Sequence, residues 1–317
     1  MIKRFLLVLV TCLVLGACGA QSVETTDSQT ADSETTERSN DSVATQYPLT
    51  VTDDSGVDVT VEKEPERIVS ILPSVTEIAF ALGLDDEIIA VTDNDDYPEQ
   101  VHEKEKVGGM ELNVEKIVAL EPDLVLAGLL NGEVVGKLRD LGLTVLVSEG
   151  ESLEDTYASI ELIGNVTNRV AEAEEMVSKM QEDVRQVEEW VSGIPDEERV
   201  NVWLEVSPEL YTAGAGTSID ELISIAGGKN VAAEQLEGWG QLSEENVVAL
   251  NPDVIVGTYA EADVRQAVAD RSAWSNITAV KENRVYGIEE SLLSRPGPRL
   301  TEGLRRLAEL FYPDEVN

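Results

Sequence analysis

The sequence contains one stretch in two copies: residues 115–126 read EKIVALEPDLVL, and residues 245–256 read ENVVALNPDVIV. The copies lie 130 positions apart, and without a gap they share Glu, Val, Ala, Leu, Pro and Asp at the same places. In each copy, apolar residues at helical spacing follow a leading glutamate, a Pro-Asp pair ends the helix, and a run of branched aliphatic residues predicts a buried strand. Because solenoid repeats have periods of about 20–50 residues, one helix–turn–strand unit repeated at this distance indicates two similar lobes.

Charge is the unusual feature of an otherwise globular composition. The 317 residues include 62 Asp and Glu against 23 Lys and Arg, a formal net charge of −39. A polyanion repels nucleic acid and anionic membrane faces, so neither is expected as a partner. The acidity predicts a solvated surface suited to high salt or high pH, and it says little about mechanism.

The residues that most often carry catalysis are scarce. Both cysteines, Cys12 and Cys18, lie in the first eighteen residues, so the rest of the chain has no thiol and no disulfide. The single histidine, His102, lies in an acidic loop and cannot by itself form a three-histidine metal site. The sequence also lacks a serine-hydrolase elbow, a complete dinucleotide fingerprint and a Walker lysine. We therefore predict no catalytic residue, no metal site and no cofactor.

The N-terminus has the features of a secretory leader. Lys3 and Arg4 precede an apolar run over 5–15 that is too short to span a membrane, and residues 15–18 read LGAC. This motif resembles the bacterial lipobox, in which cleavage before the cysteine and its acylation anchor the mature protein. We expect 1–18 to be a signal peptide and 19–46 a disordered acidic tether, because that stretch has hardly any aliphatic residues. An extracytoplasmic protein anchored to the cell membrane by lipidated Cys18 is expected.

The remaining chain predicts alternating strands and helices. Residues 47–153 predict the N-terminal lobe, with a hairpin over 49–61 and strands over 67–72, 88–91 and 144–147. Helices are expected over 74–82 and 133–141. Ser74-Val75-Thr76-Glu77 has the pattern of a capping box, so Glu77 is expected to cap a helix, with a ligand role as the alternative. Strands alternating with helices indicate parallel sheets covered on both faces.

Residues 154–195 predict a linking helical segment. From Val170 to Val191, apolar residues step by three and four along one face, which predicts one long helix that joins the lobes and allows only small hinge motions. Residues 196–317 predict the C-terminal lobe. Its expected elements are a strand over 200–206, a glycine-rich loop over 211–216, a second capping box over 218–221, helices over 218–226 and 264–269, a strand over 284–288 and a last helix ending at 311.

The predicted fold is therefore α/β, with two similar lobes, a ligand cleft between them and one long helix joining them. Open α/β sheets bind ligands at the carboxyl ends of their strands, which places the expected site in that cleft.

Five segments resemble the substrate-binding proteins of ABC importers for cobalamin, haem and iron-siderophores. They are RIVSILPSVTEIAFALGL (67–84), DYP (96–98), VGGMELNVEKIVALEPDLVLA (107–127), GWGQLSEENVVALNPDVIV (238–256) and RPGPRL (295–300). The match is collinear over about residues 65–312 and is most similar to cobalamin-binding proteins. It implies a monomeric receptor that captures cobalamin or a similar corrinoid and delivers it to an ABC permease dimer with its ATPase. Haem or a ferric siderophore is the alternative ligand, and a chelatase-like enzyme or a structural surface lipoprotein is an alternative of another class.

The resemblance also assigns roles to residues. The leading glutamates of the repeat, Glu115 and Glu245, match those that dock onto permease arginines, although a first-turn glutamate is also favoured by the helix dipole. The residues that match ligand contacts of the family are Pro73, Asn94, Tyr97, Met110, Glu205, Trp239, Ser291 and Arg295.

Trp239 is the strongest of these candidates. An indole between two glycines offers a flat face to a corrin or porphyrin, and a buried core position is its alternative. Tyr97 could ligate a haem iron, but packing under the DYP turn is the favoured role for this side chain. Asn94, Met110 and Glu205 stand where cobalamin binders often have aromatic residues. The resemblance therefore does not decide between a corrinoid, haem and a siderophore.

Overall fold

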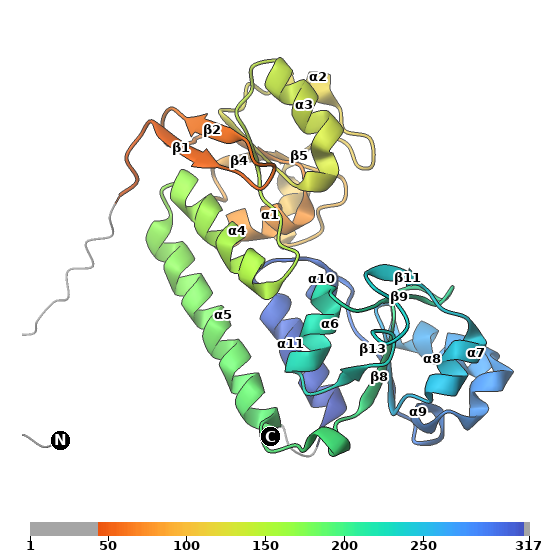
Figure 1. Cartoon of the computed structure of the whole chain (residues 1–317). Coiled ribbons are helices and arrows are strands. Elements are labelled where there is room, and N and C mark those ends of the chain that lie inside the picture. Colours follow the sequence, from red (N-terminus) through yellow and green to blue (C-terminus); the bar gives the residue numbers. More distant parts are fainter. Residues whose placement is uncertain (1–43, 314–317) are drawn as a thin grey trace, which may run out of the picture. The chain divides into compact units, whose positions relative to one another are not determined.

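The protein is described by a computed structural model of residues 44–313 (Figure 1). The predicted signal peptide, Cys18 and most of the predicted tether lie outside this range. Residues 44–313 belong to one compact unit. None of the helices in this range is long and apolar enough to cross a membrane.

The N-terminal lobe is built on a parallel sheet. Within the described residues this sheet has five strands in the order β5-β4-β3-β6-β7. They are β3 (Ile68–Ser70), β4 (Ile88–Val91), β5 (Glu105–Lys106), β6 (Leu124–Ala127) and β7 (Val145–Val147). The chain runs outward from β3 to β5 and then returns to β6 on the other side of β3, so the strand order switches between β3 and β6. A ligand site is expected at such a switch.

Helices and a hairpin complete this lobe. The helices are α1 (Pro73–Ala81), α2 (Val114–Ala119) and α3 (Gly132–Asp140), with short 3-10 turns η1 (Glu99–Glu103) and η2 (Leu129–Asn131). The predicted hairpin is confirmed as β1 (Leu49–Thr52) paired antiparallel with β2 (Asp58–Val61). It is fixed to the end of β7, because Asp53 accepts the backbone N–H of Val147 at 2.9 Å and Asp54 donates its own N–H to the carbonyl of that residue at 3.1 Å.

The C-terminal lobe repeats this plan. In the part of the chain that the structure describes, its main sheet has four parallel strands in the order β10-β8-β12-β13. They are β8 (Asn201–Glu205), β10 (Lys229–Asn230), β12 (Val254–Gly257) and β13 (Val285–Gly287). The helical elements are η3 (Asp196–Glu198), α6 (Ser218–Ile225), α7 (Glu244–Leu250), α8 (Glu261–Asp270), η4 (Ser272–Asn276), α9 (Thr278–Lys281), α10 (Ser291–Ser294) and α11 (Leu300–Phe311). The order switches between β8 and β12, the counterpart of the switch in the first lobe.

The repeated stretch forms the same structure in both lobes, as predicted. Its copies are α2 with β6 and α7 with β12, and each helix is capped two residues before the repeat begins. Asn113 accepts the N–H of Lys116 at 2.9 Å, and Ser243 accepts the N–H of Asn246 at 3.2 Å. Each helix is terminated by a residue in the left-handed region directly before the proline, with φ of 49° at Glu121 and 44° at Asn251.

The aspartate of each Pro-Asp pair ties the repeat to the central strand of its sheet. Asp123 accepts the backbone N–H of Arg67, directly before β3, at 2.9 Å. Asp253 accepts the backbone N–H of Asn201, the first residue of β8, at 2.9 Å. The aspartate that the two copies share therefore satisfies a donor at the start of the neighbouring strand, which explains its presence in both copies.

Two helices connect the lobes. The apolar spacing correctly predicts α5 (Val170–Val191), and α4 (Leu153–Val166) precedes it within the expected linking segment. Figure 1 shows α4 and α5 side by side. α4 also contacts α1 of the first lobe, whereas α5 contacts α6 and α11 of the second. One apolar core continues from the first sheet through Ile160, Val177 and Met180 to the second sheet.

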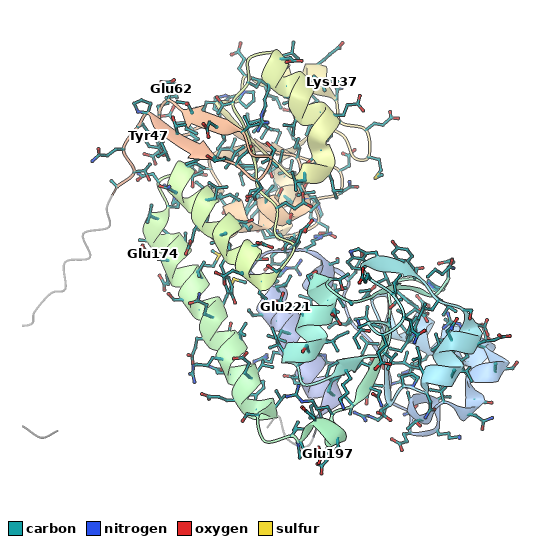
Figure 2. All side chains as sticks on the ribbon, in the orientation of Figure 1. Tyr47, Glu62, Lys137, Glu174, Glu197 and Glu221 are labelled. Carbon is teal, nitrogen blue, oxygen red and sulfur yellow. The ribbon has the colours of Figure 1, made fainter. Side chains whose placement is uncertain are left out.

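Three local predictions are wrong. α1 begins at Pro73 with Leu72 at its N-cap and no side-chain cap, so the capping box at 74–77 does not form. Thr217, not Ser218, caps α6, and Glu221 (labelled in Figure 2) instead accepts the N–H of Leu153 at 3.0 Å. The expected glycine-rich loop begins as a strand, β9 (Tyr211–Ala213), which pairs antiparallel with β11 (Trp239–Gln241).

Candidate functional site

Exposed apolar side chains gather on segments that follow or extend from the carboxyl ends of the strands. Six of the nine large hydrophobic residues that are exposed in residues 44–313 belong to this group: Tyr97, Met110, Leu129, Leu130, Tyr211 and Trp239. Isolated exposed apolar residues are ordinary, but a collection at one edge of two sheets marks a binding surface. The carboxyl edges of both sheets therefore form the candidate site.

Two aromatic rings form a platform on the C-terminal lobe. Trp239 on β11 is 46% exposed and Tyr211 on β9 is 41% exposed. Their ring planes differ by 6° and their centroids lie 6.5 Å apart, so the two exposed rings are nearly parallel and stack beside each other. The register places Trp239 opposite Ala213 and Tyr211 opposite Gln241, which makes the two aromatics diagonal neighbours on one face. The exposure of Trp239 rules out the core alternative. Our sequence reasoning missed Tyr211, whose strand pattern is hidden by the glycines that follow it.

Gly214 lets the platform strand approach its neighbour. A Cβ at this position would lie 2.2 Å from the carbonyl oxygen of Leu236, and the Gly214 N–H donates to the carbonyl of Gly238 at 2.8 Å. No larger residue fits that approach. The glycine therefore holds the segment leading to Trp239 against the strand that carries Tyr211.

Glu205 lies beneath this lobe's carboxyl edge and does not contact solvent. Its side chain is fully buried at the end of β8. It accepts hydrogen bonds from Arg271 Nη1 at 2.7 Å, Arg271 Nη2 at 2.9 Å, Trp203 Nε1 at 3.1 Å and the Tyr259 hydroxyl at 2.5 Å. The predicted contact of Glu205 with a ligand therefore has no support in this structure, because its oxygens are already occupied by four donors.

Arg271 connects Glu205 to the loop that leads into the platform. It donates to the carbonyl oxygen of Pro208 at 2.7 Å, and its guanidinium lies 4.3 Å from the Trp274 ring centroid. Burial alone would lower the pKa of Arg271, but the hydrogen bonds and charge of Glu205 raise it. Burial, together with the Glu205 carboxylate, also raises the pKa of the Tyr259 hydroxyl. This ion pair fixes the 206–210 loop that precedes Tyr211.

The predicted residues of the N-terminal lobe lie on loops after β4 and β5. Asn94, Tyr97 and Met110 are all exposed, and Pro73 is half-buried in the first turn of α1. Between them, Asp95 is buried and accepts the N–H of Thr92 at 2.7 Å. Its burial raises the pKa of that carboxyl. Leu129 and Leu130, in η2 after β6, are further exposed residues that the sequence reasoning did not single out.

Arg295 and Glu77, which are far apart in the sequence, form an ion pair. Arg295 Nη1 donates to Glu77 Oε1 at 3.1 Å and to Asp96 Oδ1 at 2.5 Å, and Arg299 donates to both oxygens of Glu77. The expectation that Glu77 caps α1 is therefore wrong, because its buried carboxylate pairs with two arginines. Ser291 is nearly buried and donates to Glu289. The hydrogen bond from Ser291 is the main reason that the pKa of Glu289 is lowered.

The leading glutamates of the repeat are exposed in both lobes. Glu115 lies in the first turn of α2 and Glu245 in the first turn of α7. Neither carboxylate has an ion pair or hydrogen-bond partner among residues 44–313. This leaves both free for a partner outside the chain, and their docking role stays a prediction.

The described residues include a hollow of about 390 Å³ that follows β12 and β13 and is lined by residues 258–261 and 287–290. A larger groove of about 690 Å³ runs between α5 and α11 and includes Arg299 in its lining. Within residues 44–313, no group of three or more His, Cys, Asp or Glu side chains is placed to hold a metal ion. The hollow after β12 and β13 adjoins the candidate site.

Comparison with known proteins gives the family. Residues 68–292 match the periplasmic binding protein family. An uncharacterized ABC transporter substrate-binding lipoprotein of Bacillus subtilis, YvrC, is 44% identical over 275 residues, which cover 84% of this chain and 87% of YvrC. A cobalamin-binding protein of Halobacterium salinarum is 32% identical over 282 residues, covering 85% of this chain and 75% of the relative.

A solved structure agrees with these sequence matches. A possible iron-binding (periplasmic solute-binding) protein from Staphylococcus epidermidis is 32% identical, with a TM-score of 0.70, covering 79% of this chain and 100% of that one. These relatives are binding proteins rather than enzymes, and the predicted two-lobed α/β fold is confirmed. The chain therefore belongs to the periplasmic binding protein family and is a substrate-binding protein of an ABC transporter, in the class that includes cobalamin-binding proteins.

Proposed function

We propose that the protein is an extracytoplasmic receptor, anchored through Cys18 and monomeric, that captures cobalamin or a similar corrinoid between its lobes. It delivers this ligand to an ABC permease dimer with its ATPase and performs no chemistry on it. The observation that carries the proposal is the Tyr211–Trp239 platform, because two exposed, nearly parallel aromatic rings offer apolar contact to a broad, flat ligand. The likeness to a cobalamin-binding protein supports the same ligand.

Haem or a ferric siderophore is the second candidate, supported by the likeness to a possible iron-binding protein. Haem carries two propionate groups, and arginine is the residue that best recognises carboxylates. Within residues 44–313, however, the three arginines near the strand ends, Arg271, Arg295 and Arg299, are each paired with a carboxylate of the protein. This pairing favours the corrinoid over haem, because the amide groups of a corrinoid need no arginine counter-charge.

The ligand is tested by titrating the purified protein with cobalamin, haem and a ferric siderophore and measuring heat by calorimetry. We expect cobalamin to bind at micromolar concentration or below. Trp239→Ala should weaken binding by about 5- to 30-fold, since loss of an aromatic stacking contact costs about 1–2 kcal/mol. Trp190→Ala is the matched control, because Trp190 is also partly exposed but lies on α5, away from the platform. Equal effects of the two substitutions, or no binding of cobalamin, would overturn the proposal.

Docking is tested separately from ligand capture. Glu115→Lys with Glu245→Lys reverses both free carboxylates and should abolish uptake into cells that carry the cognate permease, while ligand affinity is unchanged. A permease dimer with two-fold symmetry presents the same docking site twice, so each of the two similar lobes can contact one copy of that site. Glu174→Lys with Glu188→Lys, both exposed on α5, makes the same change in net charge and should leave uptake intact. Uptake that survives the first double substitution contradicts the docking assignment.

A further inference from the structure

Two arginines in the segment between α10 and α11 reach the N-terminal lobe. Arg299 donates from Nε and Nη2 to the two carboxylate oxygens of Glu77, at 2.9 and 2.8 Å, and Arg295 adds a third bond at 3.1 Å. Glu77 lies 222 positions before Arg299 in the chain. α1, which carries Glu77, packs on β3, β6 and α4, whereas α11 packs on α6 and α10 of the second lobe. These bonds therefore join the two lobes.

The centre of this network is buried. The side chain of Glu77 is 2% exposed, and that of Arg299 is 13% exposed. The hydrogen bond to Glu77 raises the pKa of Arg299, although burial opposes this change. A bidentate pair away from water is held more tightly than a surface pair, because separation would leave a charged group buried without a partner.

The outer part of the network is exposed. Arg295 also binds both oxygens of Asp96, at 2.5 and 3.2 Å, and the Asp96 side chain is 63% exposed. The hydrogen bond from Arg295 is the main reason that the pKa of Asp96 is lowered. Exposed pairs of this kind contribute little and are screened by salt. The ion pairs of Glu77 are therefore costly to break, whereas the exposed ion pair of Asp96 can be broken at little cost in free energy.

The RPGPR sequence, between α10 and α11, brings both arginine side chains to the glutamate of α1. Pro296 and Pro298 fix their own φ angles, which stiffens the short segment between Arg295 and Arg299. The segment passes close to the first turn of α1, since a Cβ on Gly297 would lie 3.7 Å from the Ser74 carbonyl oxygen. Both guanidinium groups are therefore presented together to Glu77.

We propose that Glu77, Asp96, Arg295 and Arg299 form a clasp that sets the opening of the two lobes and positions the ring of Tyr97. The Arg299 guanidinium lies 3.9 Å from the Tyr97 ring centroid, so the clasp also holds an exposed aromatic residue of the candidate site. Motions that keep the Glu77–Arg299 pair and release only Asp96 are favoured, because they leave no buried charge unpaired. The clasp acts whichever ligand the protein carries.

The opening of the lobes is measured without ligand by pulsed electron spin resonance between two spin labels. The full chain with Cys12→Ser and Cys18→Ser has no other cysteine, so Lys137→Cys and Glu282→Cys place one label on an exposed site of each lobe. We expect one narrow distance distribution in this parent protein. Arg299→Met and Glu77→Gln should each add a second population at another distance. Arg295→Met should broaden the distribution less, because Arg299 still neutralises Glu77.

Arg305→Met is the matched control, since Arg305 lies on α11 and, among residues 44–313, its ion-pair partner is Glu309 on the same helix. It should leave the distribution unchanged. Should Arg299→Met or Glu77→Gln fail to fold, Arg295→Met and Arg299→Lys decide the question, because both keep a cation beside Glu77. A distribution identical to the parent in every folded clasp variant would overturn the clasp. Since no ligand is present, this result is independent of whether cobalamin binds, and Arg299→Met should in addition speed the release of any ligand found by titration.

Discussion

Replacing Arg271 by methionine leaves the buried carboxylate of Glu205 without its counter-charge. Glu205 has no exposed surface, and Arg271 provides two of its four hydrogen bonds. Methionine fills similar space but donates no hydrogen bond. The negative charge of Glu205 is then stabilised by the neutral donors Trp203 and Tyr259, without the guanidinium. The Pro208 carbonyl and the Trp274 ring lose their contact with the guanidinium as well.

The expected loss of stability can be worked out from these contacts. Removing one partner of a buried ion pair costs about 3–5 kcal/mol. Losing a desolvated cation–π contact adds about 1–2 kcal/mol. The expected total is therefore about 4–7 kcal/mol, and at about 2–4 °C per kcal/mol for a body of this size the Tm should fall by roughly 8–28 °C.

Thermal unfolding at pH 8, followed by circular dichroism, measures this loss. Glu205→Leu combined with Arg271→Met should be less destabilised than Arg271→Met alone, because it removes the buried charge together with its partner. Arg265→Met on the neighbouring helix α8, whose partners are exposed, should change stability by about 0.5 kcal/mol or less. A loss below about 1 kcal/mol, or a double variant that is no more stable than Arg271→Met, would refute the reasoning.

Three further substitutions test burial and packing. Burial raises the folded-state pKa of Asp95 above its unfolded value, so the stability it contributes is lost as pH rises through the folded pKa. Asp95→Asn should therefore gain stability over the native protein at pH 8 and lose that advantage toward pH 4 in thermal melts; a constant difference contradicts this. Gly303→Ala on α11 should cost about 1–3 kcal/mol in urea unfolding, because its Cβ would lie 2.1 Å from the Leu292 carbonyl oxygen. Gly136→Ala on α3 meets nothing within 4 Å and should instead gain up to about 1 kcal/mol; similar effects at the two glycines would count against the packing argument.

The resemblance of the sequence identified the class of protein correctly, but it assigned individual roles less well. It placed Trp239 and Tyr97 among the expected ligand contacts, and the structure has both side chains exposed, Trp239 on β11 and Tyr97 on the loop after β4. It placed Glu205 in the same group, although that side chain is buried beneath the loops and holds Arg271. A motif match assigns a position along the chain, whereas contact with a ligand depends on the direction of the side chain and on the groups already bonded to it.

The sequence by itself determined the repeated helix–turn–strand unit, the long helix α5 and the parallel α/β architecture. These features follow from apolar periodicity and turn chemistry, which act between residues only a few positions apart. Only the tertiary structure decided that Glu77 pairs with Arg299 and that Tyr211 lies beside Trp239. Partners so far apart in the chain leave no local pattern, because their meeting depends on how separate elements pack and on the register of a strand pair.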